Sequence, residues 1–99
     1  MGELVARMDP DRRAMLLQKS LDAGDRARAT NEQNVWMISS QSKPGLWYRV
    51  GPQMCQCEWW TQRQTPCRHI VRADAETARE QQALNLVARL YAERAEAGL

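Results

Sequence analysis

All three cysteines and the only histidine of this 99-residue chain lie within fifteen residues. The first pair is Cys55 and Cys57, the second is Cys67 and His69, and each pair has one intervening residue. Thiolate and imidazole groups are the donors that hold tetrahedral zinc in structural sites. The clustering therefore predicts one structural zinc ion with these four side chains as its ligands.

The size of the chain makes such a site useful. A chain of this length forms one domain at most, and a domain this small buries a modest share of its surface, so its stability is marginal without a further contribution. Its apolar residues include four Trp and five Met but no Phe, so we expect a thin core built around tryptophan. Structural zinc in modules of this kind supplies on the order of 10–16 kcal/mol of apparent binding energy, which becomes folding energy.

The cysteine count and the polar N-terminus bear on localisation. Three cysteines cannot all form disulfides within one chain, and their position beside the histidine favours metal binding in a reducing compartment. The N-terminus carries Glu3, Arg7 and Asp9 where a signal peptide needs an uninterrupted apolar stretch, and no apolar run is long enough to span a membrane. We therefore expect a soluble cytoplasmic protein, in the host cytoplasm if its source is viral, without membrane contact.

The same residues argue against catalysis. A catalytic zinc keeps an open coordination position beside three protein ligands, whereas four protein ligands close the site. A cysteine nucleophile would need a separate base and an oxyanion hole, but every candidate thiol and the sole imidazole are used as metal ligands. The sequence therefore indicates no enzyme, no catalytic residue and no small-molecule substrate.

Capping signals predict the first helix. Asp9 is suited to the N-cap, Pro10 to the first helical position and Asp11 to the positive end of the helix dipole. Gly24 is the expected end of this helix. Residues 25–34 are polar and lack an apolar period, so they are expected to form a connector.

A change of period predicts a β-hairpin after the connector. Residues 35–38 and 46–50 are rich in β-branched and aromatic side chains, and the turn-forming residues 39–45 separate them. In an antiparallel pairing Trp36 and Ile38 would share one face and oppose Tyr48 and Val50. These aromatic residues are expected in the core.

Two helices are expected after the hairpin. Thr65 and Pro66 favour a helix start, which would put the second ligand pair in the first turn of a short helix ending near Ala73. Asp74 favours a new N-cap, followed by strong helix formers. The second helix has two adjacent apolar stripes, Leu84, Val87, Ala88 and Tyr91 on one and Leu86 and Leu90 on the other. The spare stripe is expected to pack on the N-terminal helix or, alternatively, on a second chain.

Together these elements predict a small α+β fold, a zinc-stabilised hairpin followed by a short helix and flanked by two further helices. Residues 1–34 would form the N-terminal helix and the connector, residues 35–73 the zinc finger, and residues 74–99 a C-terminal amphipathic helix. All three segments would belong to one compact domain.

The segment 35–73 resembles a SWIM zinc finger. Its Cys-x-Cys, nine-residue gap and Cys-x-His match the family pattern, the hairpin resembles the strand–turn–strand that precedes the ligands, and residues 66–70 resemble the closing Cys-Lys-His-Ile signature. Two departures are Glu58-Trp59, where family members often have proline, and Arg68, where lysine is commoner. The resemblance implies a ββα finger that binds DNA or protein, as a free-standing module from a phage, a mobile element or DNA metabolism.

Charge is unevenly distributed along the chain. Residues 1–34 carry six basic and six acidic side chains, residues 35–73 five against one, and residues 74–99 three against five. A basic segment favours DNA or single-stranded nucleic acid as partner, with arginines on phosphates and Trp59 or Trp60 stacking on a base. The candidate residues are Lys43, Arg49, Trp60, Arg63, Arg68 and Arg72.

The C-terminal segment supports a second hypothesis. Its net charge of −2 makes it a poor phosphate binder, whereas its spare apolar stripe is suited to a partner helix. The alternative to nucleic-acid binding is therefore a protein-interaction adaptor or a dimeric regulator, in which the C-terminal helix binds a protein partner or a second copy.

Overall fold

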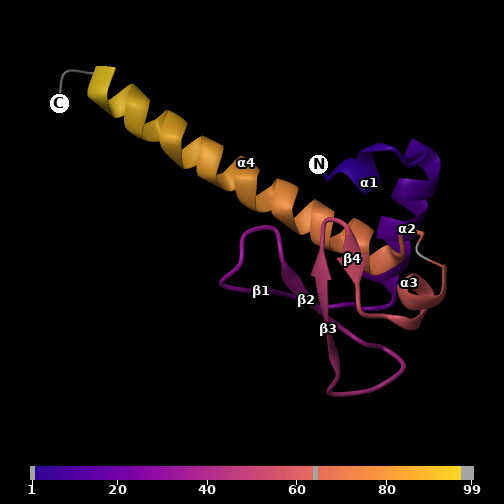
Figure 1. Cartoon of the computed structure of the whole chain (residues 1–99). Coiled ribbons are helices and arrows are strands. Elements are labelled where there is room, and N and C mark those ends of the chain that lie inside the picture. Colours follow the sequence, from indigo (N-terminus) through magenta and orange to yellow (C-terminus); the bar gives the residue numbers. More distant parts are fainter. Residues whose placement is uncertain (1, 64, 97–99) are drawn as a thin grey trace.

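Two antiparallel strands rich in aromatic and β-branched residues lie at the centre of the structure, a computed structural model that describes residues 2–63 and 65–96. The predicted small α+β class is confirmed, with a four-stranded antiparallel sheet and helices (Figure 1). The elements in chain order are α1 (Glu3–Ala6), α2 (Pro10–Asp22), β1 (Ala27–Ala29), β2 (Trp36–Ser39), β3 (Trp47–Gly51), β4 (Met54–Cys55), α3 (Glu58–Arg63) and α4 (Arg68–Glu96). Residues 97–99 of the predicted C-terminal segment lie outside the described residues.

The predicted antiparallel hairpin is confirmed, and the two predicted pairs lie opposite each other. Trp36 lies opposite Val50 and Ile38 opposite Tyr48, and the sheet order is β1-β2-β3-β4. Ile38 and Val50 are fully buried. Because side chains alternate between the two faces of a strand, these four share the face that packs against α4.

The segment predicted as a polar connector contains a strand, so that prediction is wrong for part of it. Residues Ala27–Ala29 form β1 and pair with β2, with Arg28 opposite Met37. The strand has only three residues, in the order Ala-Arg-Ala, and carries no apolar run of its own. It forms because the backbone of β2 offers a free edge for pairing.

The predicted caps of α2 are confirmed. The side chain of Asp9 accepts a hydrogen bond from the Arg12 backbone N–H at 3.1 Å, and Pro10 is the first helical residue. Gly24 follows the helix end with φ of +76°, a left-handed conformation that glycine adopts without strain. The short helices α1 and α3 are not predicted from the sequence.

The predicted break between two C-terminal helices is wrong. One helix, α4, runs from Arg68 to Glu96 without interruption at Asp74. Instead of capping a new helix, the Asp74 carboxylate accepts a hydrogen bond from the backbone N–H of Gly2. The predicted short helix is therefore the first part of a long one, and it begins at Arg68, two residues after Pro66.

The core lies where the first turns of α4 meet the inner face of the sheet. Its buried residues are Val5, Ile38, Val50, Cys55, Cys57, Cys67, Ile70 and Ala73. Helix α4 contacts all four strands and also α1 and α2, but its C-terminal half extends beyond the rest of the described chain (Figure 1). The expected packing of the spare stripe on the N-terminal helix is wrong, because Val87 and Leu90 remain 48% and 50% exposed.

None of the described helices has the length and apolar character needed to cross a membrane.

Candidate metal centre

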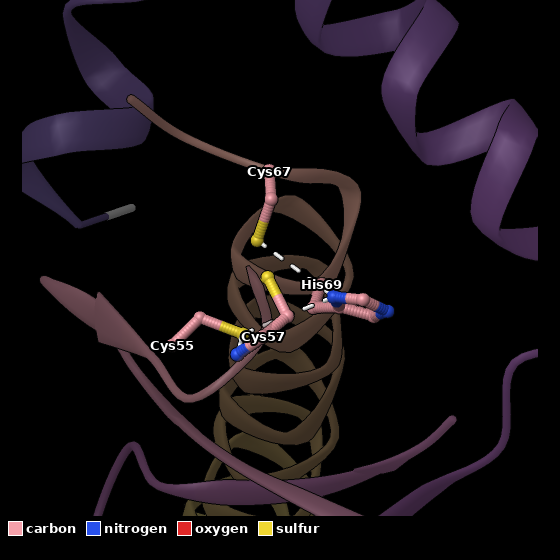
Figure 2. A group of neighbouring side chains, drawn as sticks. All are labelled: Cys55, Cys57, Cys67 and His69. Carbon is pink, nitrogen blue, oxygen red and sulfur yellow. Dashed lines mark hydrogen bonds between the residues drawn. The ribbon is translucent and has the colours of Figure 1, made fainter. Parts of the chain in front are cut away.

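Three separate junctions of the fold bring the four predicted ligands together. Cys55 ends β4, Cys57 immediately precedes α3, Cys67 immediately precedes α4, and His69 is the second residue of α4. All four are buried, and their donor atoms lie within 4.8 Å of one another (Figure 2). The structure thus contains a Cys₃His group that can hold a metal ion.

The spacing of the donors fits tetrahedral zinc. Nδ1 of His69 lies 3.8 Å from the Sγ atoms of both Cys55 and Cys67. Zinc bonds of about 2.3 Å to sulfur and about 2.0 Å to nitrogen place such donors about 3.5 Å apart at a tetrahedral angle. The other ring nitrogen of His69 points away from the sulfurs (Figure 2). Nδ1 is therefore the nitrogen that faces the site.

Local hydrogen bonds hold the first ligand pair. The backbone N–H of Cys57 donates a hydrogen bond to the sulfur of Cys55 at 3.4 Å, so residues 55–57 form a tight turn. The carbonyl of Cys57 accepts hydrogen bonds from the backbone N–H and the hydroxyl of Thr61. Cys57 thus occupies the N-cap position of α3, and its thiol lies at the positive end of a helical turn.

The second pair is placed by the start of α4. The carbonyl of Cys67 accepts the backbone N–H of Val71 at 3.3 Å, so Cys67 occupies the N-cap position. His69 lies in the first turn, and its ring is held against Tyr48 with the ring centroids 5.3 Å apart. The positive end of the helix dipole favours a thiolate at Cys67.

The thiols perturb one another's protonation. The pKa of Cys67 is lowered to about 4, first because the Cys55 thiol hydrogen-bonds to its thiolate and further by contacts from His69 and the Ile70 backbone N–H. The pKa of Cys55 is raised by the same hydrogen bond and by burial, and burial raises the pKa of Cys57. One buried thiolate beside two protonated thiols is an arrangement that a metal cation stabilises by displacing the remaining protons.

A cavity of about 750 Å³ lies beside the centre, between α2 and the turn that follows β2. The ligands Cys57, Cys67 and His69 form part of its wall, and Met15 and Trp59 line it further out. Solvent therefore approaches one side of the cluster. With all four donors bound, the ion would still have no position for a substrate.

Several of the predicted nucleic-acid contacts have partners within the protein. Arg68 forms two hydrogen bonds with the Asp25 carboxylate, and Arg72 pairs with Glu76 and donates to the carbonyl of Asp25. Trp60 is half-buried against the core. These three side chains have structural roles next to the metal centre.

The other three predicted contacts lie nearer the surface. Lys43 pairs with Glu58 at 3.8 Å, and Arg49 on β3 forms an ion pair with Glu32. The guanidinium of Arg63 lies 4.0 Å from the centroid of the Trp59 ring. All three remain accessible to a ligand at the cost of these local contacts.

Sequence reasoning missed a second group of basic residues. Arg26 and Arg28 lie beside the ring of Trp47 on β3, with guanidinium carbons 5.5 Å and 4.7 Å from the ring centroid. The only local signal is the alternating Arg-Ala-Arg at residues 26–28, within the segment predicted to be a connector. The convergence on Trp47 depends on the pairing of three strands.

A scan against protein-family models finds no match, and neither a search of curated proteins nor a search of solved structures finds one. What the chain does has to be inferred from its own residues.

Proposed function

We propose that this chain is a zinc-stabilised module that binds single-stranded nucleic acid, DNA in particular, through the outer face of its sheet. The observation that carries the proposal is the convergence of Arg26 and Arg28 on the ring of Trp47. Together with Arg49, these residues are called the arginine face below.

The register of the sheet supports a common face for these residues. Arg28 lies opposite Met37, and Met37 lies opposite Arg49 in the next strand. Trp47 lies two residues before Arg49 and thus on the same side of β3. This side is opposite to that of Val50, which faces α4.

The charge of this face suits a polyanion. It carries three guanidinium groups, and the carboxylate of Glu32 pairs with one of them, Arg49. Arg26 and Arg28 are exposed and contact an aromatic ring rather than a carboxylate among the described residues. A phosphate could therefore bind these two guanidinium groups without breaking an ion pair among the described residues.

An aromatic ring among arginines favours an unpaired strand over a duplex. Bases stack on aromatic rings and guanidinium planes only when they are not already stacked in a helix, while arginines follow the phosphates. Neither contact depends strongly on base identity, so we expect weak sequence preference.

The metal centre supports this surface from the other side of the sheet. We propose that its ion is zinc and that the centre is of the SWIM type, on the evidence of two one-residue ligand spacings after a hairpin and at a helix start. The zinc would be structural, and the chain would not be an enzyme, because four protein ligands saturate the ion. The SWIM resemblance also favours a role in DNA metabolism, a phage or a mobile element.

The proposal is tested by titrating zinc-loaded protein into labelled single-stranded DNA, single-stranded RNA and duplex DNA over a range of salt concentrations. We expect tighter binding to the single strands, with an affinity that falls as salt rises. The double variant Arg26→Ala, Arg28→Ala should reduce the slope of log affinity against log salt by about 1.4, since each phosphate contact contributes about 0.7.

The matched control is Arg79→Ala, Arg89→Ala, which removes the same charge from exposed positions on α4. It should leave the slope nearly unchanged. No binding at low salt, or equal losses in the two double variants, would contradict the proposal.

A further inference from the structure

The C-terminal half of α4 presents large apolar side chains to solvent. Residues 78–94 are exposed along their whole length, and the helix here projects beyond the rest of the described chain (Figure 1). The exposed fractions are between 48% and 69% for Leu84, Leu86, Val87, Leu90 and Tyr91. Isolated apolar residues on a surface are ordinary, but a contiguous group of five on one helix indicates an interface.

These five side chains share one side of the helix. At 3.6 residues per turn they occupy an arc of about 160°, with Val87 near its middle. They are called the apolar stripe below. Asn85 and Arg89 lie on the opposite side. The same arc also contains Arg79 and Glu80 before the stripe and Arg94 after it. Glu80 and Arg94 lie nearer the middle of the arc than Arg79, so the charges closest to the contact line are opposite at its two ends.

We propose that the apolar stripe binds a second copy of this chain, with the two α4 helices antiparallel. The charges at the two ends of the stripe indicate that the partner is a second copy in the antiparallel orientation. In an antiparallel pair, Glu80 of each copy approaches Arg94 of the other. In a parallel pair, Glu80 would meet Glu80 and Arg94 would meet Arg94, which is repulsive.

The shape of the molecule agrees with this arrangement. The sheet, the metal centre and both N-terminal helices pack on the first turns of α4, and the loop between β1 and β2 lines a pocket with Glu80 and Leu84. The C-terminal half of α4, which carries the rest of the stripe, projects beyond them (Figure 1). In an antiparallel pair the two sheets and their metal centres would lie at opposite ends of the helix pair. The pairing is independent of the metal centre and of the proposed nucleic-acid surface.

The length of the apolar stripe limits the expected affinity of the dimer. From Glu80 to Arg94 the helix is about 22 Å long. Stable complexes bury about 800 Å² on each partner, more than one face of such a short helix provides. The dimer is therefore expected to be in equilibrium with monomer and to form as protein concentration rises.

Sedimentation equilibrium of the zinc-loaded full chain tests the proposal. We expect a concentration-dependent mass between one and two chains. Val87→Glu should raise the dimer dissociation constant at least about tenfold, because it buries a charge at the centre of the interface. The matched control Asn85→Glu introduces the same charge on the opposite side and should leave the constant nearly unchanged.

Charge reversal tests the antiparallel orientation and the identity of the partner. Glu80→Arg alone and Arg94→Glu alone should each weaken self-association, because each places like charges together. An equimolar mixture of these two single variants should associate as well as the original chain, since both end contacts again join opposite charges. The proposal would be overturned by a monomeric mass at every protein concentration or by equal effects of Val87→Glu and Asn85→Glu on the dissociation constant. It would also be overturned if the mixture associated no more tightly than each charge-reversal variant alone.

Discussion

The carboxylate of Asp25 and the guanidinium of Arg68 form a two-point ion pair that ties the loop after α2 to the first turn of α4. The two hydrogen bonds measure 2.9 Å and 3.2 Å, and the Ser20 hydroxyl donates a third bond to Asp25 at 2.8 Å. The Asp25 side chain is fully buried, while that of Arg68 is 31% exposed. Since Arg68 lies between two metal ligands, the pair also fixes the second ligand pair against the rest of the fold.

Loss of this pair should be costly. Asp25→Ala leaves the Ser20 hydroxyl and the Arg68 guanidinium without their shared acceptor, so the free energy of unfolding should fall by about 3 kcal/mol. Urea denaturation of the zinc-loaded protein measures it. Asp22→Ala removes an exposed carboxylate at the end of α2 and serves as the control. Equal destabilisation by the two substitutions would show that the buried ion pair contributes no more to the free energy of unfolding than an exposed carboxylate does.

Replacement of Arg68 by lysine separates geometry from charge. Lysine keeps the positive charge but cannot form both hydrogen bonds to the Asp25 carboxylate. We expect Arg68→Lys to lower the unfolding free energy by about 1 kcal/mol, the value of one hydrogen bond. Thermal denaturation in the presence of zinc checks this, and an unchanged midpoint would contradict the two-point contact.

The thin core should be sensitive to loss of volume. Ile38 is fully buried at the centre of the sheet, so Ile38→Ala should destabilise the zinc-loaded protein by about 3 kcal/mol. Leu46 is 42% exposed in the turn before β3, and Leu46→Ala should cost much less. Urea denaturation compares them, and similar losses would mean that the core lies elsewhere.

Zinc affinity should depend steeply on pH. The raised pKa values of Cys55 and Cys57 mean that both thiols hold protons at neutral pH, and zinc must displace them. At least two protons leave per ion, so affinity should fall at least about 100-fold for each unit that the pH is lowered. Competition with a chromogenic chelator at several pH values measures this slope. An affinity independent of pH would exclude thiolate coordination.

Local patterns in the sequence predicted the elements that depend on local chemistry. The caps of α2 and the hairpin follow from neighbouring residues, and the four donors stand out because of their spacing. The end of β4 at Cys55 and the start of α4 beside Cys67 are close to the donors along the chain and were predicted, whereas the helix start at Cys57 was not.

The features that sequence reasoning missed depend on distant contacts. Strand β1 exists because β2 provides its hydrogen-bonding partners, and Trp47 meets Arg26 and Arg28 only across three paired strands. Asp74 has the chemistry of an N-cap, but the backbone N–H of Gly2 uses its carboxylate instead. The sequence predicts Arg68 as a phosphate contact because its actual partner, Asp25, lies 43 residues earlier and leaves no local signal.

The most direct test of the account is the metal content and metal dependence of the purified protein. Elemental analysis should give one zinc ion per chain, and removal of zinc by a strong chelator should abolish the cooperative unfolding transition. Cys57→Ser should lose both the zinc and the transition. A chain that unfolds cooperatively at the same temperature with and without the chelator would contradict a structural metal centre.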